Sequence, residues 1–439
     1  MRGYLPAIRK SLLVPAIASI GMLAGCGRTT ARPPSSALDE AAREYVRLAV
    51  ALGDRDPDAL DFYYGPQDWV ADIHRHPPSL AEIKKAAQEI AGKLTELPVL
   101  KDADARRGSF LLGQLKAISA RADLLLAVSH TFDQEAELFF GIHLTSGTPD
   151  LAAVRSELAR LLPRGGDLAA RYAAFDERFM IPPERVPLVM ERAVQACREQ
   201  TLAHWKLPAD EKVTLEYVHD KPWSAYSSYQ GGYHSIIRIN LDLGLTVDRA
   251  LRLACHEGYP GHHVFNALTE EQLVRTQNRR EFWVQPTFSP QSLLSEAAAT
   301  VAPDLAFSGP ERVRFEQNVL FPLAKLRPTG TQQYLIVERL VDALNPTELA
   351  VARDYLDGKL EFVRAAAALN DQALMAHAEA TLRYLNEYRT YVVTYTEGKD
   401  RLEKWLDLHA SESEASDGRW GTFQRLIGEA GFGAINGSP

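Results

Sequence analysis

The sequence predicts a mainly α-helical domain that carries one small β-sheet. Apolar residues recur at three- and four-residue spacing through most of the 439 residues, which is typical of amphipathic helices. Turn-forming stretches such as "DRDPD", "LPRGGD" and "MIPPER" separate these helices. Residues 212–243 differ, because they are rich in Val, Thr, Tyr and Ile. Hydrophobic residues make up 46% of the chain, so we expect a large core.

The first predicted helix begins near Leu38, where Leu38, Ala42 and Tyr45 share one helical face. Four further amphipathic stretches follow before the strand-rich segment: 79–98, 104–132, 150–162 and 182–204. Helical patterns resume at Val247 and continue to the end of the chain. No linker divides this body, so residues 38–439 are predicted to form a single domain.

The segment 212–243 predicts two or three strands beside the helices. The last of them is "HSIIRINL" (234–241), and Gly231 and Gly232 lie in the middle of the segment. We therefore expect a small sheet directly before the next helix.

The first 25 residues are predicted to be a signal peptide, because a basic start precedes a short apolar run. The run is too short for a spanning helix and ends in Leu-Ala-Gly-Cys, with the cysteine at position 26. This ending resembles a bacterial lipobox, in which the cysteine is lipidated and becomes the mature N-terminus. Acyl chains on Cys26 would anchor the protein to a membrane. An ordinary signal peptide with an unrelated cysteine is the alternative.

Residues 26–37 are small and rich in Pro and Ser, which predicts a flexible tether between lipid and body. Gly27 follows the cysteine. An aspartate there would resemble an inner-membrane retention signal, so Gly27 favours the outer membrane if the source is Gram-negative. The predicted localisation is thus exported and lipid-anchored, facing the periplasm or the cell surface.

Charge and cysteine content exclude other classes of protein. The signal peptide carries three positive charges, so its removal changes the net charge from −8 to −11. Such an acidic body argues against nucleic acid or anionic lipid headgroups as ligands. With Cys26 lipidated, only Cys197 and Cys255 remain, so the sequence does not predict a disulfide-stapled scaffold. It makes no prediction of the oligomeric state.

The segment "CHEGYPGHH" (255–263) differs from the H-E-x-x-H zinc motif in one respect. In that motif two histidines four residues apart converge on one helix face. Pro260 stands at the corresponding position after His256. A straight helix would put His263 on the face of His256 but about 10 Å further along the axis, too far to share one ion.

A straight helix is excluded in any case, because Pro260 has no N–H for the carbonyl of His256. Gly258 and Gly261 flank the proline and permit unusual backbone conformations. A two-residue bulge would let His262 replace the second histidine of the motif. His256 and His262 are therefore the predicted pair, and His263 is the alternative second ligand. An accidental cluster is the other interpretation, since the chain has 12 histidines.

A catalytic zinc site needs three protein ligands and an open position. The best third ligand is Glu296, in "FSPQSLLSEAAATVAPDLAF" (288–307), which opens a predicted helix. The role that remains for Glu257, next to the first histidine, is that of a general base.

These residues resemble a bacterial family known as domain of unknown function 885, with its H-E-x-x-P-G-H signature and a later glutamate segment. That family is similar to gluzincin metallopeptidases, especially Taq-type carboxypeptidases. The resemblance implies a helical fold, a small sheet lining a deep cleft, and Zn²⁺ held by His256, His262 and Glu296, with Glu257 as base. It is specific over 223–305. Ala297 and Ala298 depart from it, standing where Gly and Trp are usual.

The resemblance also implies roles for residues outside the motif. An edge strand pairs with the substrate backbone in gluzincins, and residues 229–241 are the segment for that task, with a plain core strand as the alternative. His234 is a candidate oxyanion donor or a structural histidine. Tyr391 and Tyr395 are candidates to stabilise the tetrahedral intermediate, or they pack a helix into the core. Cys255 is interpreted as a buried apolar residue and not a nucleophile.

The resulting hypothesis is a membrane-anchored zinc peptidase that hydrolyses peptide substrates. The alternative is a peptidase-like lipoprotein that binds peptides or a partner without turnover. The altered residues after Glu296 motivate this alternative.

Overall fold

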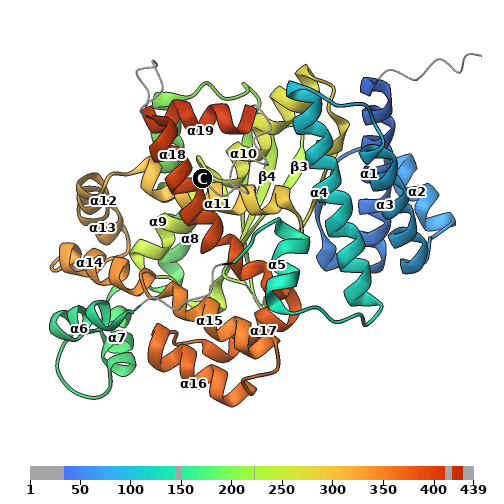
Figure 1. Ribbon diagram of the computed structural model, residues 1–439. Helices are drawn as coiled ribbons and strands as arrows, with labels where there is room; N and C mark the ends of the chain where they lie inside the picture. Colours follow the sequence, from blue (N-terminus) through green and yellow to red (C-terminus); the bar gives the residue numbers. More distant parts are fainter. Residues whose placement is uncertain (1–33, 145–149, 222, 411–417, 429–439) are drawn as a thin grey trace, which may run out of the picture. The chain divides into compact units, whose positions relative to one another are not determined.

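The structure describes the chain from Pro34 onward. Figure 1 shows the computed structural model, which describes residues 34–144, 150–221, 223–410 and 418–428. The predicted signal peptide, Cys26 and the tether up to residue 33 lie outside these described residues. Residues 34–37 were expected in the tether but begin the first helix, since proline is well suited to a first helical turn.

Helices dominate the described residues, which confirms the predicted fold class. α1 (Pro34–Arg55) packs against α3 (Leu80–Thr95) and α4 (Asp102–Leu125). The apolar face that the sequence predicts for α1 is buried, with Leu38 and Tyr45 fully inaccessible. Burial of this apolar face stabilises the packing of α1 against α3 and α4, which lie beside it in Figure 1.

The remaining α-helices follow along the chain. They are α2 (Gln67–Arg75), α5 (Phe132–Phe140), α6 (Ala152–Leu161), α7 (Leu168–Asp176), α8 (Val186–His204), α9 (Val247–Leu253), α10 (His262–Thr269), α11 (Pro290–Ala306), α12 (Gly309–Phe315), α13 (Phe321–Leu323), α14 (Thr331–Asp342), α15 (Asn345–Leu356), α16 (Phe362–Ala373), α17 (Ala378–Tyr388), α18 (Glu397–Ala410) and α19 (Gly418–Gly428). Among the described residues, none of these helices is long and apolar enough to cross a bilayer.

The predicted sheet is present and has three strands: β2 (Lys212–Val218), β3 (Ala225–Gly231) and β4 (His234–Asn240). The strand order is β2-β4-β3, so β4 is central, parallel to β2 and antiparallel to β3. Gly231 ends β3, and Gly232 and Tyr233 form the turn to β4; all three residues have positive φ.

A second, two-stranded sheet was not predicted. β1 (Leu60–Tyr63) pairs antiparallel with β5 (Val284–Pro286), more than two hundred residues along the chain. Both strands are too short for periodicity to reveal, and neither has a local partner. The register shifts between Leu60 and Phe62, so Asp61 lies at a β-bulge.

The histidine motif interrupts a helix in two steps. α9 begins at its Thr246 cap, as expected, and continues as a π-helical segment, η5 (Ala254–Gly258). The chain then leaves the helix through a cis Tyr259–Pro260 peptide bond, and α10 starts at His262. The interruption is thus a break and a restart, where the sequence predicted a bulge within one helix. Proline and the close approach of Gly261 to the preceding turn account for the difference.

One disulfide joins α8 to the motif. Cys197 and Cys255 are bonded across 58 residues, and both side chains are fully buried. The burial predicted for Cys255 is confirmed, but the interpretation of it as a free apolar residue is wrong. Only tertiary packing brings α8 beside η5, so cysteine spacing alone did not reveal the bond. Disulfides of this kind persist in oxidising compartments, which agrees with the predicted export.

Removal of this disulfide is expected to destabilise the protein. The double variant Cys197→Ala/Cys255→Ala should lose about 4 kcal/mol of unfolding free energy, because a cross-link of this span restricts the unfolded chain. Urea denaturation with and without reductant measures the loss. Reductant should destabilise the wild type by a similar amount and leave the double variant unaffected. A wild-type transition that is insensitive to reductant would contradict the bond.

Candidate metal centre

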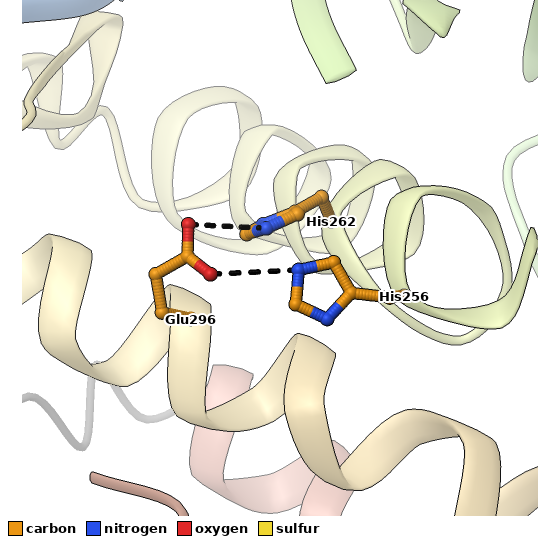
Figure 2. Close-up of side chains that lie close together, drawn as sticks. All are labelled: His256, His262 and Glu296. Atoms are coloured by element: carbon orange, nitrogen blue, oxygen red, sulfur yellow. Dashed lines mark ion pairs between the residues drawn. The ribbon is translucent and has the colours of Figure 1, made fainter. Parts of the chain in front are cut away.

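Three side chains predicted as metal ligands meet in the structure. Nε2 of His256 lies 3.5 Å from Oε2 of Glu296, and Nε2 of His262 lies 3.3 Å from Oε1 of the same carboxylate. One donor atom from each residue lies within 4.8 Å of the others. Figure 2 shows both imidazole rings turned toward the glutamate. Among the described residues, this is the only cluster of His, Cys, Asp and Glu with such spacing.

The break in the motif helix produces this arrangement. His256 lies on η5, and His262 is the first residue of α10, so the two rings meet edge to face with centroids 4.8 Å apart. Glu296 comes from the second turn of α11, which packs against both segments. In H-E-x-x-H, the two histidines are neighbours on one straight helix. Here the turn at Tyr259–Gly261 brings His256 and His262 together.

Gly261 is required at that turn. Its N–H donates to the carbonyl oxygen of Cys255 at 3.0 Å, which closes the turn. A Cβ at this position would lie 1.8 Å from the carbonyl oxygen of His256 and 2.5 Å from that of Cys255. Real Cβ atoms do not approach backbone so closely, so only glycine fits here.

The charges at the centre favour a cation. Burial tends to raise the pKa of Glu296, but the two histidines outweigh it and hold that pKa below its ordinary value. Burial would lower the pKa of His262, yet the Glu296 carboxylate raises it to about 9. A metal ion competes with such protons for the ring nitrogens, so its binding would release a proton.

Tyr391 orients the glutamate. Its hydroxyl donates a 2.8 Å hydrogen bond to Oε1 of Glu296 and lies 3.0 Å from the hydroxyl of Ser292. Burial, followed by the nearby Glu296 charge, raises the pKa of Tyr391 well above its ordinary value, so the phenol stays protonated. The sequence offered Tyr391 as a stabiliser of the intermediate or as a packing residue. In the structure, the hydroxyl of Tyr391 is hydrogen-bonded to Glu296, a predicted metal ligand.

His263 points in another direction from α10 than His262 and contacts a different carboxylate. Its Nε2 lies 2.9 Å from Glu211, and its Nδ1 lies 2.9 Å from the hydroxyl of Ser235 on β4. Burial lowers the pKa of His263, and a neutral ring can donate to the glutamate and accept from the serine. Both nitrogens are therefore used in fastening α10 to the sheet. This leaves His262 as the second candidate ligand.

A cavity of about 560 Å³ opens onto the centre. Its lining includes all three candidate ligands together with Glu257, Tyr391 and Tyr395. Glu257 is 5% exposed and close enough to His262 to interact with it electrostatically. The hydroxyl of Tyr395 lies 3.4 Å from that of Tyr384. Such a volume is typical of pockets that bind small ligands or a few residues of a peptide.

His234 lies outside the candidate metal centre. It begins β4, and its Nε2 is 3.1 Å from the hydroxyl of Thr214 on the neighbouring strand β2. It is not among the described residues that line the cavity. The structural alternative that the sequence offered for His234 therefore fits its position better than the oxyanion role.

The segment 229–241, proposed to pair with a substrate, needs correction in its larger part: residues 229–231 end the edge strand β3, whereas most of the rest is β4. β4 is hydrogen-bonded on both sides, so residues 234–240 have no free edge. The edge strands of this sheet are β2 and β3. The N–H of Asn240 donates to the carbonyl of Ser224, so by antiparallel alternation the backbone groups of Ala225 and Ser227 point away from β4. Both residues line the cavity.

Asp61 and Tyr226 are among the cavity residues that were not predicted. Asp61 from the β1 bulge and Tyr226 from β3 both line the cavity, and the Tyr226 hydroxyl donates to Asp61 Oδ1 at 2.7 Å. Neither belongs to a recognisable motif. Only the tertiary pairing of β1 with β5, and its contact with β3, could have placed them there.

Comparison with known proteins gives only distant similarities. No family model matches the chain, and no curated protein does. The chain resembles the crystal structure of a proposed lipoprotein from Colwellia psychrerythraea, with a TM-score of 0.49 and 14% identity over 92% of this chain and 75% of that one. It also resembles a proposed lipoprotein of unknown function from Shewanella oneidensis, with a TM-score of 0.45 and 11% identity over 93% and 79% of the two chains.

Proposed function

We propose that this protein is a zinc-dependent peptidase. The observation that carries the proposal is the meeting of two imidazoles and one carboxylate at the end of a cavity, with a buried glutamate beside them. Two nitrogens and one oxygen from protein, with space for one more ligand, are the donor set of catalytic zinc sites.

The residues fit a divalent cation. Oε2 of Glu296 is buried and accepts no hydrogen bond, while its ion-pair partner His256 lies 3.5 Å away. A buried carboxylate oxygen without a donor is costly unless something positive binds it. A zinc ion held by His256, His262 and Glu296 would supply a Lewis acid that polarises a peptide carbonyl and makes water more acidic.

The surrounding side chains have distinct tasks in this proposal. Glu257 takes a proton from the attacking water and later passes it to the leaving amine. Tyr391 holds the Glu296 carboxylate in position through its hydrogen bond. Tyr395, whose ring centroid lies 6.5 Å from that of His256, faces the cavity where a developing oxyanion would form.

The free edge of β3 supports a peptide as the substrate. The outward backbone groups of Ala225 and Ser227 can hydrogen-bond with an extended chain, which is the β-augmentation mode of peptide recognition. Because both residues line the cavity of the metal centre, a peptide bound there would extend toward the candidate ligands.

We also infer that the enzyme acts outside the cytoplasm, anchored through lipid on Cys26, in the outer membrane if the source is Gram-negative. The lipobox-like ending of the N-terminal apolar run supports this location. The disulfide between Cys197 and Cys255 supports export independently.

A peptide-library digest tests the proposed function. Protein purified without chelator should cleave peptides, lose this activity when a chelator removes the metal, and regain it with added Zn²⁺. Mass spectrometry of the products locates the cleaved bonds. Binding of peptides without any cleavage by the zinc-loaded protein would refute the peptidase and support a binding role.

A further inference from the structure

Asp61 is a carboxylate of the cavity that the proposed mechanism does not use. It occupies the bulge of β1, where the register with β5 shifts between Leu60 and Phe62. Bulges commonly redirect a side chain near functional sites. Asp61 lines the cavity together with the candidate ligands and interacts electrostatically with His262 and Glu296. It therefore lies close to the position of a bound scissile peptide.

Two neutral donors fix the Asp61 carboxylate. The Tyr226 hydroxyl donates to Oδ1 at 2.7 Å, and Nε2 of Gln285 donates to Oδ2 at 2.8 Å. Each carboxylate oxygen can accept a further hydrogen bond. Within the described residues, no lysine or arginine forms an ion pair with Asp61.

Partial removal from water makes the ionised form of the Asp61 carboxylate unfavourable. Burial raises the pKa of Asp61 to about 6, while the bond from Tyr226 and the proximity of His262 act in the opposite direction. The carboxylate is thus largely ionised at neutral pH. A half-buried carboxylate that is held in one orientation by neutral donors, with no ion pair to a lysine or arginine among the described residues, is typical of a site that receives a cationic partner from a ligand.

The surroundings of Asp61 suit an ammonium group. Asp58 and Tyr388 also line the cavity, and Tyr388 lies near enough to both Asp58 and Asp61 to interact with them electrostatically. Carboxylates and an aromatic ring together are favourable for an alkylammonium ion. Tyr226, which contacts Asp61, lies between the two β3 residues whose backbone faces outward.

We propose that Asp61 determines specificity by binding an ammonium group of the peptide substrate. This group is either the free α-amino terminus or a lysine side chain next to the scissile bond. The proposal rests on the proposed peptidase function, because it concerns the substrate of the same cavity.

Equilibrium binding to the full, zinc-loaded Glu257→Gln variant tests this inference without interference from cleavage. The probes are a peptide with a free N-terminus and one lysine, its N-acetylated form, and a form with norleucine in place of lysine. Loss of the recognised ammonium should weaken binding at least about tenfold, the range of a hydrogen bond to a charged group. Asp61→Asn in the same background should remove that preference, with zinc content unchanged.

A control variant and a separate hydrolysis assay distinguish the role of Asp61 from the proposed peptidase activity. Asp58→Asn should reduce the preference less, because it is Asp61 whose carboxylate is held in position by Tyr226 and Gln285. The inference is overturned if neither acetylation nor norleucine affects binding, or if Asp61→Asn weakens all three probes equally. Hydrolysis of the same peptides by the wild type is scored separately. An ammonium preference without hydrolysis would reject the peptidase and retain the role of Asp61.

Discussion

Replacement of Glu257 by glutamine is expected to abolish hydrolysis and leave metal binding intact. The amide has almost the same shape as the carboxylate but cannot take a proton from water. General-base catalysis typically contributes a factor of about 10² to 10⁴, so kcat/KM should decrease at least a hundredfold or so. Steady-state kinetics on a cleaved library peptide measures the effect, and elemental analysis confirms the zinc content.

Glu271→Gln is the matched control for this variant. Glu271 is an exposed glutamate that accepts a hydrogen bond from Tyr233 and is not among the described residues lining the cavity. Its replacement should leave kcat/KM unchanged. A Glu257→Gln protein that still cleaves at the wild-type rate would exclude Glu257 as the base.

Gly261→Ala is expected to have the second large effect. The added Cβ would overlap the carbonyl oxygen of His256, so the turn must open and His262 must move away from His256. Clashes with backbone cannot be relieved by rotating a side chain, and we expect a loss of more than about 3 kcal/mol in unfolding free energy. Thermal denaturation and metal content measure the two consequences.

Gly258→Ala provides the comparison within the same motif. A Cβ there would meet Ile237 at 3.7 Å and Val194 at 4.0 Å, which are ordinary contacts. This variant should fold and bind metal like the wild type. Equal tolerance of alanine at both positions would show that the turn does not have the geometry described.

The sequence predicts much of the fold because most of it is local. Helical periodicity and turn residues anticipate α1, α3, α4 and α8, and strand composition anticipates the three-stranded sheet. The pairing of β1 with β5 could not be anticipated, because two short strands separated by more than two hundred residues carry no local pattern.

The candidate site, like the fold, could be predicted from the sequence only in part. Chemical type and spacing pointed to His256, Glu257 and Glu296, which the structure brings to one cavity. The choice between His262 and His263 needed tertiary information, since Glu211 decides it by engaging His263. The disulfide, the place of β3 at an edge of the sheet beside the cavity and the position of Asp61 likewise depend on long-range packing.

Metal content is the most direct test of the centre formed by His256, His262 and Glu296. Protein purified without chelator should carry about one equivalent of zinc per chain by elemental analysis, as expected for one three-ligand site. His262→Ala and Glu296→Ala should each lose it, whereas His234→Ala should retain it, because that ring contacts Thr214 outside the cavity. Two results would contradict the assigned centre. One is folded wild-type protein that holds less than about a tenth of an equivalent of zinc after incubation with Zn²⁺, and the other is undiminished zinc in both ligand variants.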